Sequence, residues 1–179
     1  MKRKRMKTIA ALLVMLCVCA CAQAQTRAFT DDVDREVTVP GEISRLVVSG
    51  ALPQIYVYGI APDMFVGLAD RCYDSAKGIL PDAYIDLPYF GKLYGSADLN
   101  IEELAAADPQ IIIDMGEPKK SVSQDMDALQ RQTGIPVVSV RYRAQAFIDQ
   151  GFYDTLRLFA DVVGAQERCE EVLGYIDAC

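Results

Sequence analysis

Three consecutive isoleucines, Ile111 to Ile113, form the strongest hydrophobic signal in the chain. They lack the polar alternation of a half-exposed strand, so they predict a strand buried on both faces, as parallel strands between two helical layers are. A helix is predicted just before them, because Asn100 is a good N-cap and Glu103 completes a capping box. Pro109 ends this helix, since the residue before a proline avoids the α region.

Other apolar runs repeat the order of strand, loop and helix. The predicted strands lie at 45–49, 65–68 and 136–140, and the predicted helices at 52–60, 121–133 and from about 152 to the end, with an interruption at Gly164. Ser121 and Gln124 resemble a second capping box. Alternating strands and helices are typical of a parallel sheet with right-handed crossovers. The predicted fold class is therefore α/β, a three-layer Rossmann-like lobe with a mostly parallel sheet.

A β-hairpin is predicted before the first of these strands. Valines alternate with polar residues along 29–40, and the run from Asp31 to Asp34 supplies the turn. Aspartate tolerates left-handed backbone geometry better than most residues do, so Asp34 suits a turn position.

The first 24 residues predict an export signal outside the fold. Five Lys and Arg residues precede an apolar run from Ile9 to Ala20, which is too short for a comfortable membrane span. Ala22 to Ala24 form a small-x-small cleavage site. The residues ending at Cys21 also form an acceptable lipobox, so lipidation of Cys21 and release as a free protein both stay open.

Charge and cysteine content exclude several classes of function. The chain has 18 basic and 25 acidic residues, and removal of the five basic residues of the signal leaves 13 basic residues, a net charge of −12. Such a domain repels nucleic acid. Cys72, Cys169 and Cys179 follow the signal without a C-x-x-C pair or any histidine, so no metal site is predicted. A Cys72–Cys169 disulfide and free thiols both stay open.

The isoleucine strand and its flanks resemble a known family. After Gly95 the chain reads Asn100-Ile101-Glu102, then Ala107-Asp108-Pro109-Gln110, then the isoleucines. This order is similar to the signature of the class III periplasmic (solute) binding proteins, which are the substrate-binding components of ABC importers for iron siderophores, haem and cobalamin. The remaining segments agree in order from about Phe29 to the end. One departure is Asp34, where the family usually has glycine.

The resemblance implies a domain organisation. Residues 1–24 would be the signal peptide, 25–164 the N-terminal lobe, and 165–179 the start of the long spine helix that joins the two lobes of these proteins. That helix is cut short at Cys179. One lobe is the largest departure from the family, and it leaves open a single-lobe fragment without independent ligand binding.

The resemblance also implies that ligand is held where strands end. The loop at Gly50 and Ala51 faces the ligand in the family, and Tyr94 matches the neighbourhood of an aromatic wall. Arginine at a strand exit can hold an anionic chelate, a haem propionate or a phosphate by charge-assisted hydrogen bonds. The candidate ligand-binding residues are Gly50, Ala51, Arg71, Tyr73, Tyr94, Glu117, Arg141 and Arg143. Solvated arginines and a core tyrosine are the alternatives for these side chains.

Glu102 has a different implied role. In the family an acidic residue on each lobe docks into an arginine pocket of the permease, and Glu102 occupies the matching position. Its alternative is simple stabilisation of the helix start through the helix dipole. The expected partners are thus an ABC permease with its ATPase and a small-molecule metal chelate, outside the membrane. An enzyme of the chelatase type has only the fold analogy in its favour.

Overall fold

A parallel three-stranded sheet lies at the centre of the protein in the computed structural model, which describes residues 25–72, 74–93, 99–116, 121–146 and 148–179. Its strands are β3 (Leu46–Val48), β4 (Ile111–Asp114) and β5 (Val137–Ser139), in the order β3-β4-β5. Both pairings are parallel, with Val47 opposite Ile112 and Ile113 opposite Val138. The predicted α/β class is confirmed, and the isoleucine strand is the central one.

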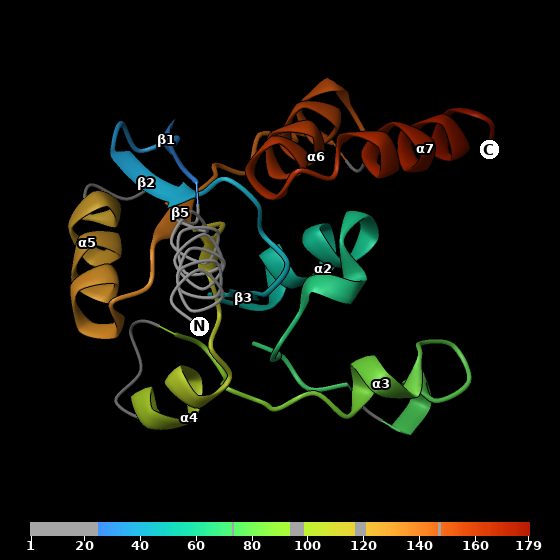
Figure 1. Ribbon diagram of the computed structural model, residues 1–179. Coiled ribbons are helices and arrows are strands. Elements are labelled where there is room, and N and C mark those ends of the chain that lie inside the picture. Colours follow the sequence, from blue (N-terminus) through green and yellow to red (C-terminus); the bar gives the residue numbers. More distant parts are fainter. Residues whose placement is uncertain (1–24, 73, 94–98, 117–120, 147) are drawn as a thin grey trace, which may run out of the picture.

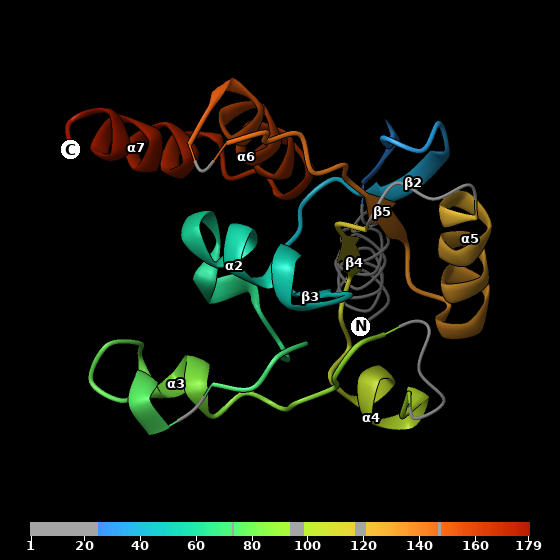
Figure 2. The same ribbon diagram turned by 180° about the vertical axis from the view of Figure 1, so that it is seen from behind.

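Helices cover both faces of this sheet (Figures 1 and 2). Helices α4 and α5 lie on one face, and α2 and α6 lie on the other, with α7 packed beside α6. The helices are α2 (Ala51–Ile60), α3 (Asp82–Ile85), α4 (Ile101–Ala106), α5 (Val122–Thr133), α6 (Gln150–Val163) and α7 (Gln166–Asp177), with 3₁₀ turns at Pro62–Met64 and Asp74–Ala76. The architecture is therefore the predicted three-layer lobe.

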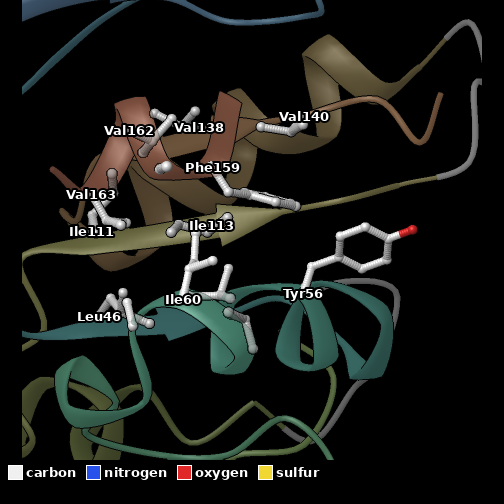
Figure 3. Close-up of a cluster of buried hydrophobic side chains, with 14 of the residues drawn as sticks. Leu46, Tyr56, Ile60, Ile111, Ile113, Val138, Val140, Phe159, Val162 and Val163 are labelled. Atoms are coloured by element: carbon white, nitrogen blue, oxygen red, sulfur yellow. The ribbon is translucent and has the colours of Figure 1, made fainter. Parts of the chain in front are cut away.

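Side chains along each strand alternate between two hydrophobic clusters. Val47, Ile112 and Val137 pack with α4 and α5 in one cluster. Their neighbours, which include Leu46, Ile111 and Ile113, pack with α2, α6 and α7 in the other (Figure 3). All three isoleucines of β4 are fully buried. Burial on both sides explains why β4 has no polar alternation.

The predicted hairpin precedes the sheet. Strands β1 (Thr26–Thr30) and β2 (Glu36–Pro40) are antiparallel, with Phe29 opposite Val37. Asp34 has a φ of 61°, so this aspartate adopts the left-handed conformation that the turn position was predicted to require. The hairpin turn therefore forms as predicted.

The strand predicted at 65–68 is wrong as a regular strand. Phe65 forms one isolated bridge to Leu46, and Leu68 forms another to Tyr89. The segment leaves β3 because it turns to pair with residues 88–90, where the N–H of Leu68 donates to the Pro88 carbonyl at 2.7 Å. The ring of Phe90 lies 1.9 Å from where a Cβ of Gly67 would stand, so a larger residue at this position would displace that ring.

Helix α7 covers the range predicted for the start of the spine helix. Cys169 and Leu173 bury one side of it against the lobe, and Gly164 separates it from α6 in a left-handed conformation with φ of 77°. The interlobe role of α7 stays a prediction. Within the described part of the chain, no helix has the length and apolar composition that a membrane crossing requires.

Candidate functional site

The three strands of the sheet end at one edge, called here the carboxyl edge. Because the strands are parallel, the residues that follow them gather there. Gly50 is the N-cap of α2 directly after β3, and Ala51 begins that helix with an exposed side chain. Arg141 and Arg143 follow β5. The structure thus brings four of the predicted ligand-binding residues to the edge where open α/β sheets bind ligands.

A buried carboxylate ties the three strand ends together. Asp114, the last residue of β4, is fully buried. The hydroxyl of Ser49 donates to its Oδ1 at 2.5 Å, and the hydroxyl of Ser139 donates to its Oδ2 at 2.8 Å. One side chain from each of three neighbouring strand ends takes part, so the loops above them start from a fixed base. Buried polar groups of this kind require such partners, and here each carboxylate oxygen has one.

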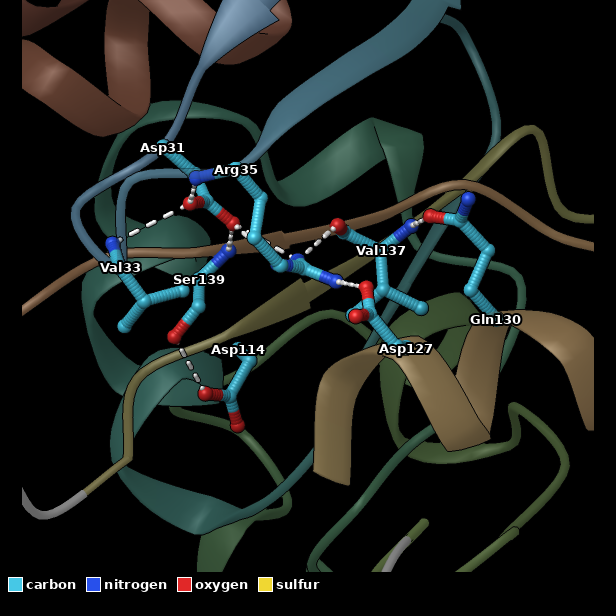
Figure 4. Close-up of polar contacts among 8 residues, drawn as sticks. All are labelled: Asp31, Val33, Arg35, Asp114, Asp127, Gln130, Val137 and Ser139. Carbon is cyan, nitrogen blue, oxygen red and sulfur yellow. Dashed lines mark hydrogen bonds and ion pairs between the residues drawn. The ribbon is translucent and has the colours of Figure 1, made fainter. Parts of the chain in front are cut away.

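The hairpin turn is fastened to the same edge (Figure 4). The buried side chain of Asp31 accepts hydrogen bonds from the guanidinium of Arg35, and its Oδ2 also accepts from the N–H of Ser139 at 3.3 Å. Arg35 in turn donates to the carbonyl of Val137 at 2.6 Å and pairs with Asp127 of α5 at 3.0 Å. The turn is therefore bonded to β5 and to the helical layer behind it.

The next residue of the turn, Asp32, reaches the loop after β5. Its N–H donates to the carbonyl of Ser139 at 3.0 Å, and its Oδ2 accepts from the backbone N–H of Arg141 at 2.8 Å. Its Oδ1 pairs with Nη2 of Arg143 at 2.6 Å. Arg143 is partly buried, whereas Arg141 is exposed. The two arginines therefore differ in environment.

An aromatic ring that sequence reasoning missed lies between these arginines. Tyr142 is 46% exposed and packs edge-on against Tyr56 of α2, with 6.2 Å between ring centres. Tyr56 also contacts Phe152 of α6 at 5.4 Å. Burial, and then the neighbouring Tyr142, raise the pKa of Tyr56 from 10.0 to about 12. Tyr142 is thus an exposed ring with a firm base, suited to stacking on a flat ligand.

Arg71 lies beside α2, after the segment that bridges to β3. The buried amide of Gln54 holds this segment: its Oε1 accepts from the N–H groups of Ala69 and Asp70 at 2.7 and 2.9 Å, and its Nε2 donates to the Asp70 carbonyl. The guanidinium of Arg71 then stacks on Tyr89, with 4.1 Å from its central carbon to the ring centre. The cation of Arg71 is thus partly satisfied by a protein ring.

Residues 143–146 are bonded to the start of α6. Asp149 is the N-cap of α6, accepting from the N–H of Phe152, and its other oxygen accepts from the N–H groups of Gln145 and Ala146. These backbone N–H groups, that of Gln145 foremost, hold the pKa of Asp149 below its usual range. An added Cβ on Gly151 would lie 2.2 Å from the carbonyl oxygen of Arg143, so only glycine lets the loop approach α6 this closely.

Several predicted residues cannot be placed. Cys21, Tyr73, Tyr94 and Glu117 lie outside the described residues, so their predicted roles stay predictions. Glu102 is exposed in the first turn of α4.

Among the described residues, Cys72, Cys169 and Cys179 are free thiols, so the Cys72–Cys169 disulfide is not formed. In the same residues, no group of three acidic, cysteine or histidine side chains could hold a metal ion.

A surface depression of about 1140 Å³ lies at the opposite edge, where the strands begin. Arg27, Gln110 and Gln166 are among the residues that line it. The guanidinium of Arg27 is already bonded to the carbonyls of Asp161 and Val162 at the end of α6, at 3.0 and 2.6 Å. Since the guanidinium of Arg27 is already bonded and no strand of the parallel sheet ends there, this depression is a weaker candidate for a ligand site than the carboxyl edge.

Several solved structures superimpose on this fold. A solute-binding protein of an ABC transporter from Sulfurospirillum deleyianum DSM 6946 superimposes with a TM-score of 0.65 at 21% identity, over 80% of this chain and 44% of that one. The molybdate-bound MolA of Haemophilus influenzae gives 0.53 at 24%, over 81% and 48%. A variant of the haem-binding protein HmuT gives 0.53 at 24%, over 84% and 45%.

These likenesses define the fold. No protein-family model matches the sequence. No curated protein matches it either. The chain has the fold of the class III periplasmic binding proteins, as predicted, and it spans less than half the length of the solved structures named above.

The contact of the Arg143 loop with α6 can be tested by Gly151→Ala. The new methyl group would collide with backbone, so we expect a loss of about 1–3 kcal/mol in the free energy of unfolding, measured by urea denaturation followed by circular dichroism. Gly174→Ala in α7 is the matched control. Nothing lies within 4 Å of its added Cβ, and we expect a gain of up to about 1 kcal/mol. Equal stability of Gly151→Ala and the wild type would contradict the described contact.

The raised pKa of Tyr56 should make the free energy of unfolding depend on pH in the alkaline range. In the unfolded chain its hydroxyl ionises near the ordinary 10.0, and in the folded protein near 12. Between these values the unfolded chain has released a proton that the folded protein keeps, so the contribution of Tyr56 to stability is full below pH 10 and is lost as pH rises toward 12. Tyr56→Phe should flatten this fall in urea denaturation at stepped pH, whereas Tyr175→Phe changes an exposed ring and serves as control. An equally steep fall in Tyr56→Phe would contradict the assignment.

Proposed function

We propose that this protein is the substrate-binding component of an ABC importer, capturing an iron–siderophore chelate, haem or a corrinoid outside the membrane and delivering it to the permease. The observation that carries the proposal is the carboxyl edge itself. There, three strand ends tied through Asp114 support an exposed ring, Tyr142, between two arginines. A binding site needs an apolar wall and a few placed polar groups, and this edge supplies both.

The composition of the site favours capture without chemistry. Tyr142 can stack on a conjugated ligand, and a guanidinium can bond its anionic oxygens. The chain has no histidine. The polar side chains that structure the edge, Asp114 and Asp32, are bonded to other protein groups and hold loops in place. The solved structures of similar fold include proteins named for haem and molybdate binding, which supports a small ligand with anionic or metal character.

Delivery requires contact with a permease, and Glu102 is the proposed docking residue. Its carboxylate is exposed in the first turn of α4, where the helix dipole favours the charged form. The neighbouring Glu103 donates its backbone N–H to the side chain of Asn100 at 3.1 Å, so Glu103 belongs to the helix cap. The two acidic residues therefore separate into one that stabilises the helix and one that is free to meet a basic partner surface.

Ligand capture is tested by titrating the full chain with haemin, a ferric catecholate siderophore and cobalamin. The chain has nine tyrosines and no tryptophan, so quenching of tyrosine fluorescence reports binding, and the Tyr142→Ala variant tests its location. We expect a saturable response to one probe. Its affinity should fall about tenfold or more in Tyr142→Ala, because stacking of a flat conjugated group on an aromatic ring contributes on the order of 1–3 kcal/mol. Tyr175→Ala, which removes an exposed ring on α7, is the control. A folded wild type that responds to none of the three would refute the proposal.

Docking is tested separately with a candidate ABC importer, its permease and ATPase reconstituted in vesicles. Glu102→Gln removes one charge, so we expect weaker stimulation of the importer's ATPase and unchanged affinity for the bound probe. Glu103→Gln is the matched control, since its backbone N–H still reaches Asn100. Equal effects of the two substitutions would show that only the helix start is involved.

A further inference from the structure

The guanidinium of Arg143 has one satisfied side and one unsatisfied side. Its Nη2 pairs with Asp32 at 2.6 Å. Its Nη1 is buried and has no hydrogen-bond partner among the residues that the structure describes. A buried donor of a charged group that lacks an acceptor is costly, so such a group calls for an acceptor from elsewhere.

Asp32 is unusually well placed to aim this donor. Its backbone N–H donates to the carbonyl of Ser139, and its Oδ2 accepts from the N–H of Arg141. Both the main chain and the carboxylate of Asp32 are therefore held at the end of β5. The backbone of Arg143 is fixed as well, because its N–H donates to the hydroxyl of Thr155 at 3.4 Å and its carbonyl oxygen lies against Gly151. With both ends of the arginine held, the direction of Nη1 is set by Asp32.

We propose that Asp32, in the turn of the N-terminal hairpin, is a positioning residue of the ligand site: it holds Arg143 so that Nη1 points at an anionic oxygen of the ligand. This rests on the proposed function, which places ligand at the carboxyl edge. The pair Asp32–Arg143 carries no net charge, so it orients a hydrogen-bond donor toward the ligand but adds little long-range attraction for an anion. The ligand group that it fits is an oxygen acceptor such as a carboxylate or an inorganic oxyanion.

The first arm of the test needs no ligand. In ¹⁵N-arginine-labelled full chain, a guanidinium held by a carboxylate rotates slowly and gives separate Nη signals. We expect separate signals for Arg143, assigned by their absence in Arg143→Gln, and their collapse in Asp32→Asn. Asp34→Asn is the matched control: Asp34 is exposed in the same turn, and asparagine also accepts its φ of 61°. Averaged signals in the wild type would overturn the proposal.

The second arm compares haemin with haemin dimethyl ester, which has the same ring but no anionic propionates, and with molybdate. Arg143→Gln and Asp32→Asn should each bind haemin or molybdate roughly tenfold more weakly, the loss of about one charge-assisted hydrogen bond. Both should bind the ester as the wild type does, and Asp34→Asn should bind all three normally. The double variant should be no weaker than Arg143→Gln alone, because the two residues act through one donor.

The outcomes separate the two proposals. Additive losses, equal losses for haemin and its ester, or tighter anion binding by Asp32→Asn would overturn the positioning role while leaving ligand capture intact. A wild type that shows the Asp32–Arg143 pair by NMR but binds no probe would refute capture at this edge and the positioning role with it. If Asp32→Asn does not fold, Arg143→Lys replaces it in the test. Lysine keeps the positive charge but lacks the two guanidinium nitrogens that could bond Asp32 and the ligand at once. Full affinity in that variant would overturn the proposal.

Discussion

The central strand of this protein has no side facing water, and the rest of the lobe follows from that constraint. Ile111, Ile112 and Ile113 are fully buried and point alternately to opposite faces, so each face requires its own layer of helices. Parallel pairing with β3 and β5 satisfies the backbone of β4 on both edges. Once these strands are parallel, their carboxyl ends must lie together, and the carboxyl edge results from packing alone.

A hydrophobic sandwich by itself would leave the strand exits loosely defined. The polar ties at the carboxyl edge remove that freedom: Asp114 links three strand ends, and Asp31 and Asp32 bring the hairpin turn onto β5. Such ties contribute little net stability, because each bond replaces one with water. Their cost when broken is larger, since a buried carboxylate would lose its partners. They therefore act mainly by defining one arrangement of the loops.

Local signals in the sequence predicted most of the fold, because helix caps, glycines and apolar runs act over a few residues. Asn100 caps α4 as predicted, and Gly134 ends α5 with φ of 73°. Ser121 was predicted to cap α5 with its side chain and does not, since its backbone is already helical rather than extended. The sequence alone does not predict which residues far apart in the chain contact one another. The pairing of residues 65–68 with 88–90, the ties from Asp32 to Arg143, and the seat of Tyr142 on Tyr56 all join segments far apart in the chain.

The charge of the protein favours recognition of a ligand by oriented contacts at short range over long-range electrostatic attraction. The chain after residue 24 carries a net charge of −12, so its long-range field repels anions. The arginines at the carboxyl edge do little to reverse that field, because Arg143 is paired with Asp32 and the exposed Arg141 adds a single positive charge. An anionic ligand would therefore gain little from steering and must be held by contacts at short range. Fixed rings and aimed donors meet that requirement, because a group held in place before binding loses little further freedom when the ligand arrives.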